Sequence, residues 1–405
     1  MPSLSQPQTP SKHHSRVAEE KWTTASCSEI DKISIENKDS PLLRAKYTQL
    51  RSKREAIAKF LKEHKNEDLS LYIDELRDLA VSNGGLVDDE FRAIIWPILA
   101  DNLLQAEEKG DDAGSSNDSD FESAFSELED SSLEDEQEAD EDVLRQHKEW
   151  HQVELDVNRT LARFPPNITD VHRTTLQKEL IPLIVRVLRL NPRFNYYQGF
   201  HDICLTVLLV CGVKDSFRIC SNLARNGAFN NYLLKSLEGS VVKELDLMYV
   251  ILSRVEPQLE KMMRSVELGS IFALSWPLTW FSHSLQHYQQ IVRFFDCFLA
   301  APRLLPVYVA STIVVFRKSS IFSCEREMPF IHRLLSEMPH ELPVDAILKD
   351  AVYLAKLMPP TLLRTHYYEE YRKTVAAPPR NLITKTIPRF DCENSPNSTD
   401  LHDSE

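Results

Sequence analysis

Glycine is scarce in this chain, with 9 among 405 residues. Tight β-hairpin turns depend on glycine, most often as Asn-Gly or Asp-Gly, and such pairs are few here. This excludes a protein built from many hairpins. The sequence also lacks a repeat of fixed period, which argues against a solenoid of helical repeats. Apolar residues instead recur three and four positions apart, so we predict an all-α fold.

Long apolar runs are absent as well. The longest uncharged run, Leu268–Val292, contains a proline and several His and Gln residues. The strongly apolar segment Ile203–Val213 has about half of the roughly 20 residues that a membrane-spanning helix needs. The N-terminus has no apolar segment of the signal-peptide kind. We therefore expect no transmembrane helix in this chain and a cytoplasmic location.

The cysteines follow no pattern that predicts a disulfide or a metal site. There are seven, at positions 27, 204, 211, 220, 297, 324 and 392, and none forms a C-x-x-C pair. An odd, scattered set argues against a disulfide framework and a zinc site, and it fits a reducing compartment. We predict no metal site.

The net charge of −14 comes from one segment of the chain. Residues 107–142 hold 17 of the 61 acidic residues and one of the 47 basic residues, which leaves 46 basic and 44 acidic elsewhere. The remainder is close to neutral, so we expect no nucleic-acid partner. A serine-rich acidic stretch buries too little apolar surface to order itself, and we predict a disordered insert over residues 105–142.

The periodicity divides the rest of the chain. Residues 1–40 are polar and predicted to be disordered. Residues 41–65 form a predicted basic amphipathic helix; a solvated face is the simpler interpretation, and contact with an anionic membrane surface is the alternative. A helical domain is expected over 66–365 and a polar tail over 366–405. The later helices of this domain are predicted at about 216–226, 240–264, 268–287 (kinked at Pro277), 289–300, 305–318, 328–336 and 344–357.

Two short strings carry the functional information. The first is V-E-L-D-V-N-R at Val153–Arg159, in which Asp156 and Arg159 are one helical turn apart. By itself this spacing is equally typical of a surface ion pair. The second is Y-Y-Q-G at Tyr196–Gly199, and a lone tetrapeptide recurs by chance. Together and in order, separated by one apolar helix over 176–190, they are far more specific.

The strings resemble the IxxDxxR and YxQG fingerprints of TBC-domain proteins, GTPase-activating proteins for Rab GTPases, with Val in place of Ile. The resemblance extends over roughly residues 70–360. It includes Phe91–Trp96, which is similar to the family's RxxxW element, and Arg293–Asp296, which is similar to RxWD with Phe in place of Trp. It implies a multi-helix TBC-type domain that is not a repeat protein.

The resemblance also implies roles. Arg159 would be an arginine finger and Gln198 a glutamine finger, both supplied to a Rab in its GTP form, while Asp156 orients the guanidinium. Gly199 would permit close backbone approach, and Tyr196 would be a packing residue. For Arg92 and Trp96 a structural role is expected. The chain would need no cofactor of its own, because GTP and magnesium arrive with the Rab; it would activate the Rab's hydrolysis and would not be an independent hydrolase.

Three interpretations follow from these residues. The leading one is a catalytic activator of Rab GTPases in vesicle transport. Longer strings around both motifs are similar to a branch of the family that acts between the endoplasmic reticulum and the Golgi, which suggests a peripheral location at those membranes. A non-catalytic adaptor that binds a Rab is the first alternative. An unrelated helical scaffold is the second, and the order and spacing of the motifs make it improbable.

Overall fold

The computed structural model describes residues 41–104, 140–166 and 168–374. The disorder predicted for 1–40 and for 105–139 lies outside these residues. The described chain is helical throughout and contains no strand, which confirms the all-α prediction. Its elements are α3 (Pro41–Glu63), η1 (Leu69–Tyr72), α4 (Ile73–Val81), α5 (Asp89–Asp101), α8 (Glu141–Leu144), α9 (Trp150–Leu161), α10 (Asp170–Arg189), α11 (Phe200–Arg225), α12 (Asn230–Leu234), α13 (Val241–Val255), α14 (Pro257–Ser265), η2 (Ser270–Ala273), α15 (Ser275–Leu278), α16 (Tyr288–Ala300), α17 (Leu305–Phe316), α18 (Lys318–Ser323), α19 (Met328–Ser336), α20 (Val344–Leu357), α21 (Pro360–Leu362), η3 (Leu363–Tyr367) and α22 (Tyr368–Thr374).

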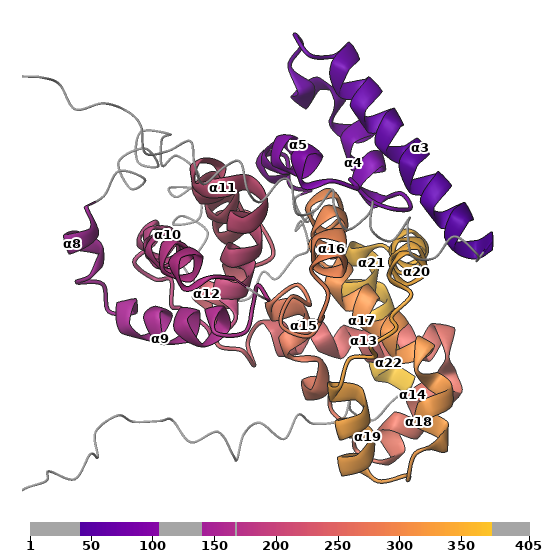
Figure 1. Cartoon of the computed structure of the whole chain (residues 1–405). Helices are drawn as coiled ribbons and strands as arrows, with labels where there is room; N and C mark the ends of the chain where they lie inside the picture. The colour runs from indigo at the N-terminus through magenta and orange to yellow at the C-terminus, as the bar shows by residue number, and fades with distance from the viewer. Residues whose placement is uncertain (1–40, 105–139, 167, 375–405) are drawn as a thin grey trace, which may run out of the picture.

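The helices form two groups that meet at α15 and α16 (Figure 1). One group holds α8 to α12, in magenta, and the other holds α13 to α22, in orange and yellow, while α3, α4 and α5 lie along one edge. Helix α9 packs on α10, α10 packs on α11, and α11 packs on α5 at the edge. This stack fixes α9 relative to the start of α11, and these two places carry the sequence motifs.

The stack holds because α10 is apolar around most of its circumference. Nine of its residues are buried, from Leu176 to Leu188. A helix that is apolar on nearly every side must be covered on nearly every side, and α9 and α11 provide that cover. Its first turn is capped by Thr169, whose hydroxyl accepts from the backbone N–H of His172 at 3.3 Å. The prediction of a core helix at this place is confirmed.

Several other helices lie where periodicity places them. The predicted helices 328–336 and 344–357 coincide with α19 and α20. The helix predicted at 216–226 is the second half of α11, which is interrupted at Gly212 with φ +69°. The predicted helix 240–264 is in fact two, because the chain breaks at Glu256 and restarts with Pro257, whose ring cannot continue a preceding helix.

The helix predicted over 268–287 is wrong. The segment forms only the short η2 and α15, and turns follow until α16 begins at Tyr288. Trp280 and Phe281 adopt φ of +45° and +66°, outside the helical region, and both side chains are buried. The packing of these rings, with Phe281 against Trp276 and Trp280 against Phe295, outweighs the local helical preference.

Two predicted boundaries also change. Helix α8 starts at Glu141, inside the stretch assigned to the acidic insert, with Asp140 accepting from the backbone N–H of Asp142. The predicted polar tail from residue 366 begins inside η3, and its described part continues as α22 to Thr374. No helix within the described ranges is long and apolar enough to cross a membrane.

One side of helix α3 packs against the domain. Ile57 is buried, and the rings of Phe60, His64 and Tyr72 cluster at its end. Arg54 pairs with the buried carboxylate of Asp88. Asp88 directly precedes α5, but its side chain makes no capping hydrogen bond. Most other basic side chains of α3 are exposed, namely Arg44, Lys46, Arg51, Lys59 and Lys62.

Candidate functional site

Arg159 lies in the last turn of α9 and extends into solvent from a buried anchor. Its side chain is 62% exposed, whereas that of Asp156, one turn earlier, is 1% exposed. Nη1 of Arg159 donates to Oδ1 of Asp156 at 3.1 Å. The pair is therefore no ordinary surface ion pair. A buried carboxylate fixes one end of the guanidinium and leaves the other donors of the planar group facing outward.

Gln198 is exposed on the loop that joins α10 to α11. Gly199 follows it with φ +116°, a conformation that side chains with a Cβ rarely adopt. A Cβ at this position would lie 2.7 Å from Cγ2 of Thr279. The glycine thus permits the loop to approach the segment after α15. Tyr197 ties the loop down, since its hydroxyl donates to the carbonyl of Leu278 at 3.0 Å.

Both motifs line one cavity of ≈ 340 Å³. Arg159, Gln198, Asp156 and Gly199 contribute to its wall, together with Thr160, Arg163, Tyr197, His201, Asp202, Leu237, Leu274, Ser275, Leu278, Thr279 and His283. A larger depression of ≈ 740 Å³ lies beside α3 and contains no residue of either motif. The cavity between α9, α11 and α15 is therefore the candidate site.

Hydrogen bonds connect the two motifs beneath this surface. Tyr196 donates from its hydroxyl to Oδ2 of Asp156 at 3.1 Å, and the same hydroxyl lies 2.7 Å from Nδ1 of His201. Nε2 of His201 lies 2.8 Å from Oγ1 of Thr160. Burial raises the pKa of Tyr196, and the Asp156 carboxylate adds to this rise. Tyr196 was expected to be a packing residue; it is also a hydrogen-bonded link between the motifs.

The carboxylate of Asp202 and the imidazole of His283 form another part of the cavity wall. Asp202 is buried in the first turn of α11, and its Oδ2 lies 3.3 Å from Nδ1 of His283. Contact with this carboxylate raises the pKa of His283 above its usual value, although partial burial opposes the rise. For His201, burial lowers the pKa and the Asp202 and Asp156 carboxylates oppose that effect.

No sequence motif singles out Thr160, His201, Asp202 or His283. Thr160 and His201 are 41 residues apart, and Asp202 and His283 stand on different elements. Thr160, His201 and Asp202 directly flank the motifs, and that proximity is the one signal that could have drawn attention to them.

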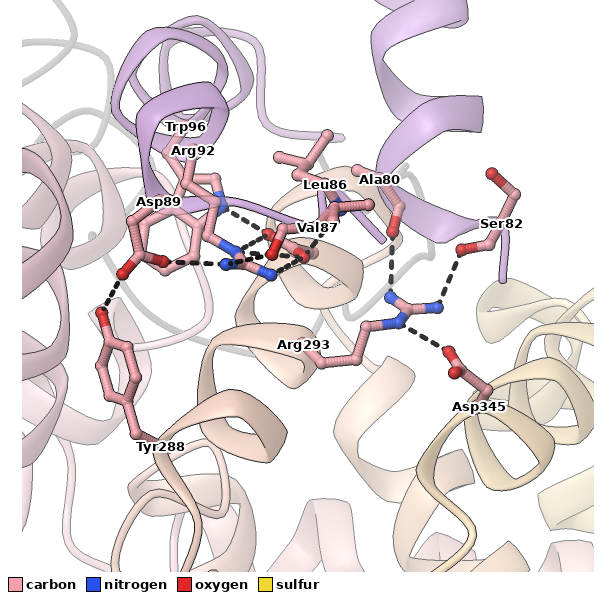
Figure 2. Close-up of polar contacts among 11 residues, drawn as sticks. Ala80, Ser82, Leu86, Val87, Asp89, Arg92, Trp96, Tyr288, Arg293 and Asp345 are labelled. Atoms are coloured by element: carbon pink, nitrogen blue, oxygen red, sulfur yellow. Dashed lines mark hydrogen bonds and ion pairs between the residues drawn. The ribbon is translucent and has the colours of Figure 1, made fainter. Parts of the chain in front are cut away.

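Arg92 and Trp96 are in a different place, within a buried polar cluster around Asp296 (Figure 2). Nε and Nη2 of Arg92 donate to the Asp296 carboxylate at 3.0 and 3.1 Å, and Nε1 of Trp96 donates to it at 2.8 Å. The two side chains of α5 thus meet at one acceptor on α16 and do not line the cavity. Phe295 occupies the position of Trp in the RxWD element, and its ring stacks on that of Trp96 with ring centroids 5.7 Å apart.

The described residues include no group of three or more His, Cys, Asp or Glu side chains arranged to hold a metal ion. The polar groups of the cavity are instead an exposed guanidinium, an exposed carboxamide and their buried supports. These groups are suited to binding and orienting an anionic ligand from another molecule.

Comparison with known proteins decides the family. A model of the Rab-GTPase-TBC domain matches residues 89–322. This chain belongs to that family. It is 35% identical over 288 residues to TBC1 domain family member 20 of Mus musculus and 34% identical over 288 residues to the protein of that name from Homo sapiens. These matches cover 71% of this chain and 64% of each relative's length.

More distant proteins are similar to this chain in sequence or in fold. GTPase-activating protein gyp10 of Schizosaccharomyces pombe is 26% identical over 228 residues, which is 55% of this TBC chain and 60% of gyp10. The crystal structure of the Ypt/Rab-GAP domain of Gyp1p superposes with a TM-score of 0.56 at 15% identity, covering 76% of this chain and 99% of that one. The flagellar RabGAP TBC domain of Chlamydomonas gives 0.50 at 13% identity, covering 77% and 95%. The predicted TBC-type fold is confirmed.

Proposed function

We propose that this TBC domain accelerates GTP hydrolysis by a Rab GTPase, to which it supplies Arg159 and Gln198. The observation that carries the proposal is that both side chains are exposed on the wall of one cavity although they belong to different elements. The similarity to the family branch noted above favours a Rab of the early secretory pathway, between the endoplasmic reticulum and the Golgi.

The chemistry needs no further group from this chain. In phosphoryl transfer, catalysis is mainly positioning and stabilisation of the negative charge that develops on the phosphoryl oxygens. A guanidinium offers a permanent charge and several donors in one plane. A carboxamide can accept a hydrogen bond from the attacking water and donate another to the phosphate at the same time. The Rab would bring the nucleotide and the magnesium ion.

The experiment that tests this proposal is single-turnover GTP hydrolysis with a panel of purified Rabs, paired with binding of the same GTP-loaded Rabs. Acceleration of at least one Rab is expected. A chain that binds a Rab but accelerates none would be the non-catalytic adaptor. The exposed Arg159 and Gln198 favour the catalytic function, because an adaptor has no use for either.

Replacing Gln198 by alanine is expected to lower the stimulated rate about 10²-fold, in the range of losing one positioned donor at a transition state. Binding of the GTP-loaded Rab should change little, because the amide contributes to the reacting geometry and not to the bulk of the interface. Gln289→Ala, also at an exposed glutamine but outside the cavity, is the control and should keep the full rate. A Gln198→Ala chain with the full rate would remove the glutamine finger from the proposal.

A peripheral membrane contact is proposed for α3. The helix has seven basic and two acidic residues, and most of the basic side chains are exposed. Each basic residue near an anionic surface contributes about 1 kcal/mol. Lys59→Glu/Lys62→Glu, two exposed sites three residues apart, should therefore weaken binding to phosphatidylserine vesicles at least tenfold in sedimentation. Equal sedimentation of wild type with neutral and anionic vesicles would reject the contact.

A further inference from the structure

His201 connects the two motifs through its two ring nitrogens. Its two ring nitrogens lie 2.7 Å from the hydroxyl of Tyr196 and 2.8 Å from that of Thr160. Tyr196 belongs to the Gln198 loop, and Thr160 belongs to α9, next to Arg159. His201 is 4% exposed and lies in the first turn of α11. It therefore bridges the loop and the helix from inside the protein.

The direction of the hydrogen bond between His201 and Tyr196 follows from the donors that are available. The Tyr196 hydroxyl has one hydrogen, which it donates to Asp156, so Nδ1 of His201 must carry the hydrogen that the tyrosine oxygen accepts. Nε2 of His201 lies 2.8 Å from the Thr160 hydroxyl and 3.3 Å from Oδ1 of Asp202, so a hydroxyl and a carboxylate hold this side of the ring. The ring thus links Thr160 to Tyr196, which in turn donates to Asp156.

The series closes into a ring on one turn of α9. Asp156 and Thr160 are four residues apart, on the same face of the helix. Arg159 lies between them and donates to the remaining oxygen of Asp156. The anchor of the arginine and the position of the glutamine loop thus depend on the same set of hydrogen bonds.

We infer that His201 is a positioning residue that fastens the Gln198 loop to the turn of α9 that carries Arg159. The inference rests on the proposed function, since it names how the two fingers keep their relative place. His201 lines the same cavity but acts through Tyr196, Thr160 and Asp156. Misplacing a reacting group by about 1 Å costs on the order of 10²-fold in rate.

Three substitutions at this position separate the two bonds. His201→Phe keeps a planar ring and removes both. His201→Asn can place an amide near the site of Nδ1 and retain the bond to Tyr196, whereas His201→Gln can reach towards Thr160 instead. We expect His201→Phe to lower the maximum single-turnover rate 10- to 100-fold, without a change in the half-saturating concentration of the chain. His201→Asn should recover part of that rate, and more of it than His201→Gln.

A second readout needs no Rab. Hydrogen–deuterium exchange should become faster in His201→Phe at both residues 150–161 and residues 193–202, and to a smaller degree in His201→Asn. If wild type stimulates no Rab while both segments loosen in His201→Phe, the proposed function fails and the fastening role stands. Should His201→Phe fail to fold, Tyr196→Phe removes one hydroxyl from the same ring, and the same loss of maximum rate is expected.

Three results would overturn the inference. One is a higher half-saturating concentration at an unchanged maximum rate, which would indicate a role in the interface alone. Another is an equal loss in His201→Phe and His201→Asn, which would indicate ring packing and not hydrogen bonding. The third is exchange that increases in only one of the two segments, because then His201 does not couple them.

Discussion

Arg159→Ala is expected to lower the stimulated rate of Rab GTP hydrolysis at least about 10³-fold, the lower end of what an inserted arginine contributes to GTPases. The reason is the loss of a fixed positive charge where the transition state gathers negative charge. Arg159→Lys should lose most of the rate as well, since a flexible ammonium cannot reproduce a planar group with several donors. Single-turnover hydrolysis with saturating chain measures both.

The matched control for Arg159 is Arg372→Ala. Arg372 also pairs with an acidic residue three positions earlier, at 3.4 Å from Glu369, and its side chain is 57% exposed. It lies on α22, in the other helical group (Figure 1). It should keep the full rate. Stimulation that survives Arg159→Ala would mean that the cation comes from another residue, and Arg163 on the same cavity wall would be the next to test.

The charge effect can be separated from binding. Arg159→Ala should still bind the GTP-loaded Rab with an affinity within a few-fold of wild type, because one exposed side chain contributes little to a protein interface unless it is a buried anchor. If binding and hydrolysis were lost together, Arg159 would be part of the docking surface. The proposed arginine finger would then lack its kinetic basis.

Most of the fold could be predicted from local pattern, and the largest failure has its cause in tertiary packing. Helices such as α19 and α20 have their own periodicity and end where it ends. The segment 268–287 failed because its aromatic side chains are held by partners elsewhere: Trp280 packs on Phe295 of α16 and on Phe229. Local helical preference carries no information about such distant partners, and contact with them determines the backbone conformation of segment 268–287.

The candidate site also contains residues that local sequence indicates and residues that only the fold brings together. Arg159, Asp156, Gln198 and Gly199 stand in short strings whose resemblance to a family gave them roles before any geometry was available. His201 belongs to neither fingerprint, and its bond to Thr160 spans 41 residues. A residue that acts by joining two motifs can be found only once the fold has brought the motifs together.

Asp296→Asn is expected to destabilise the protein by about 3–5 kcal/mol, the cost of removing one partner from a buried ion pair. Its side chain is 0% exposed and accepts from Arg92, from Nε1 of Trp96 and from the backbone N–H of Leu86 at 3.0 Å. An asparagine would turn an amide group towards these donors and leave the Arg92 charge without its main partner. Urea unfolding, followed by tryptophan fluorescence, measures the loss.

Asp345→Asn is the matched comparison, and it should cost only about 1 kcal/mol because its carboxylate is partly solvated. That carboxylate is 33% exposed and pairs with Arg293 at 2.8 Å. Arg293 also donates to the carbonyls of Ala80 and Ser82 (Figure 2) and to that of Val81, each at 3.0 Å, so its charge stays satisfied. Equal losses in the two variants would show that burial of Asp296 does not govern the cost.

Where Asp296→Asn remains folded, it should stimulate a Rab normally, because the cluster around Asp296 joins α5 to α16 and lines no part of the cavity. A folded variant without activity would place this cluster in the functional site.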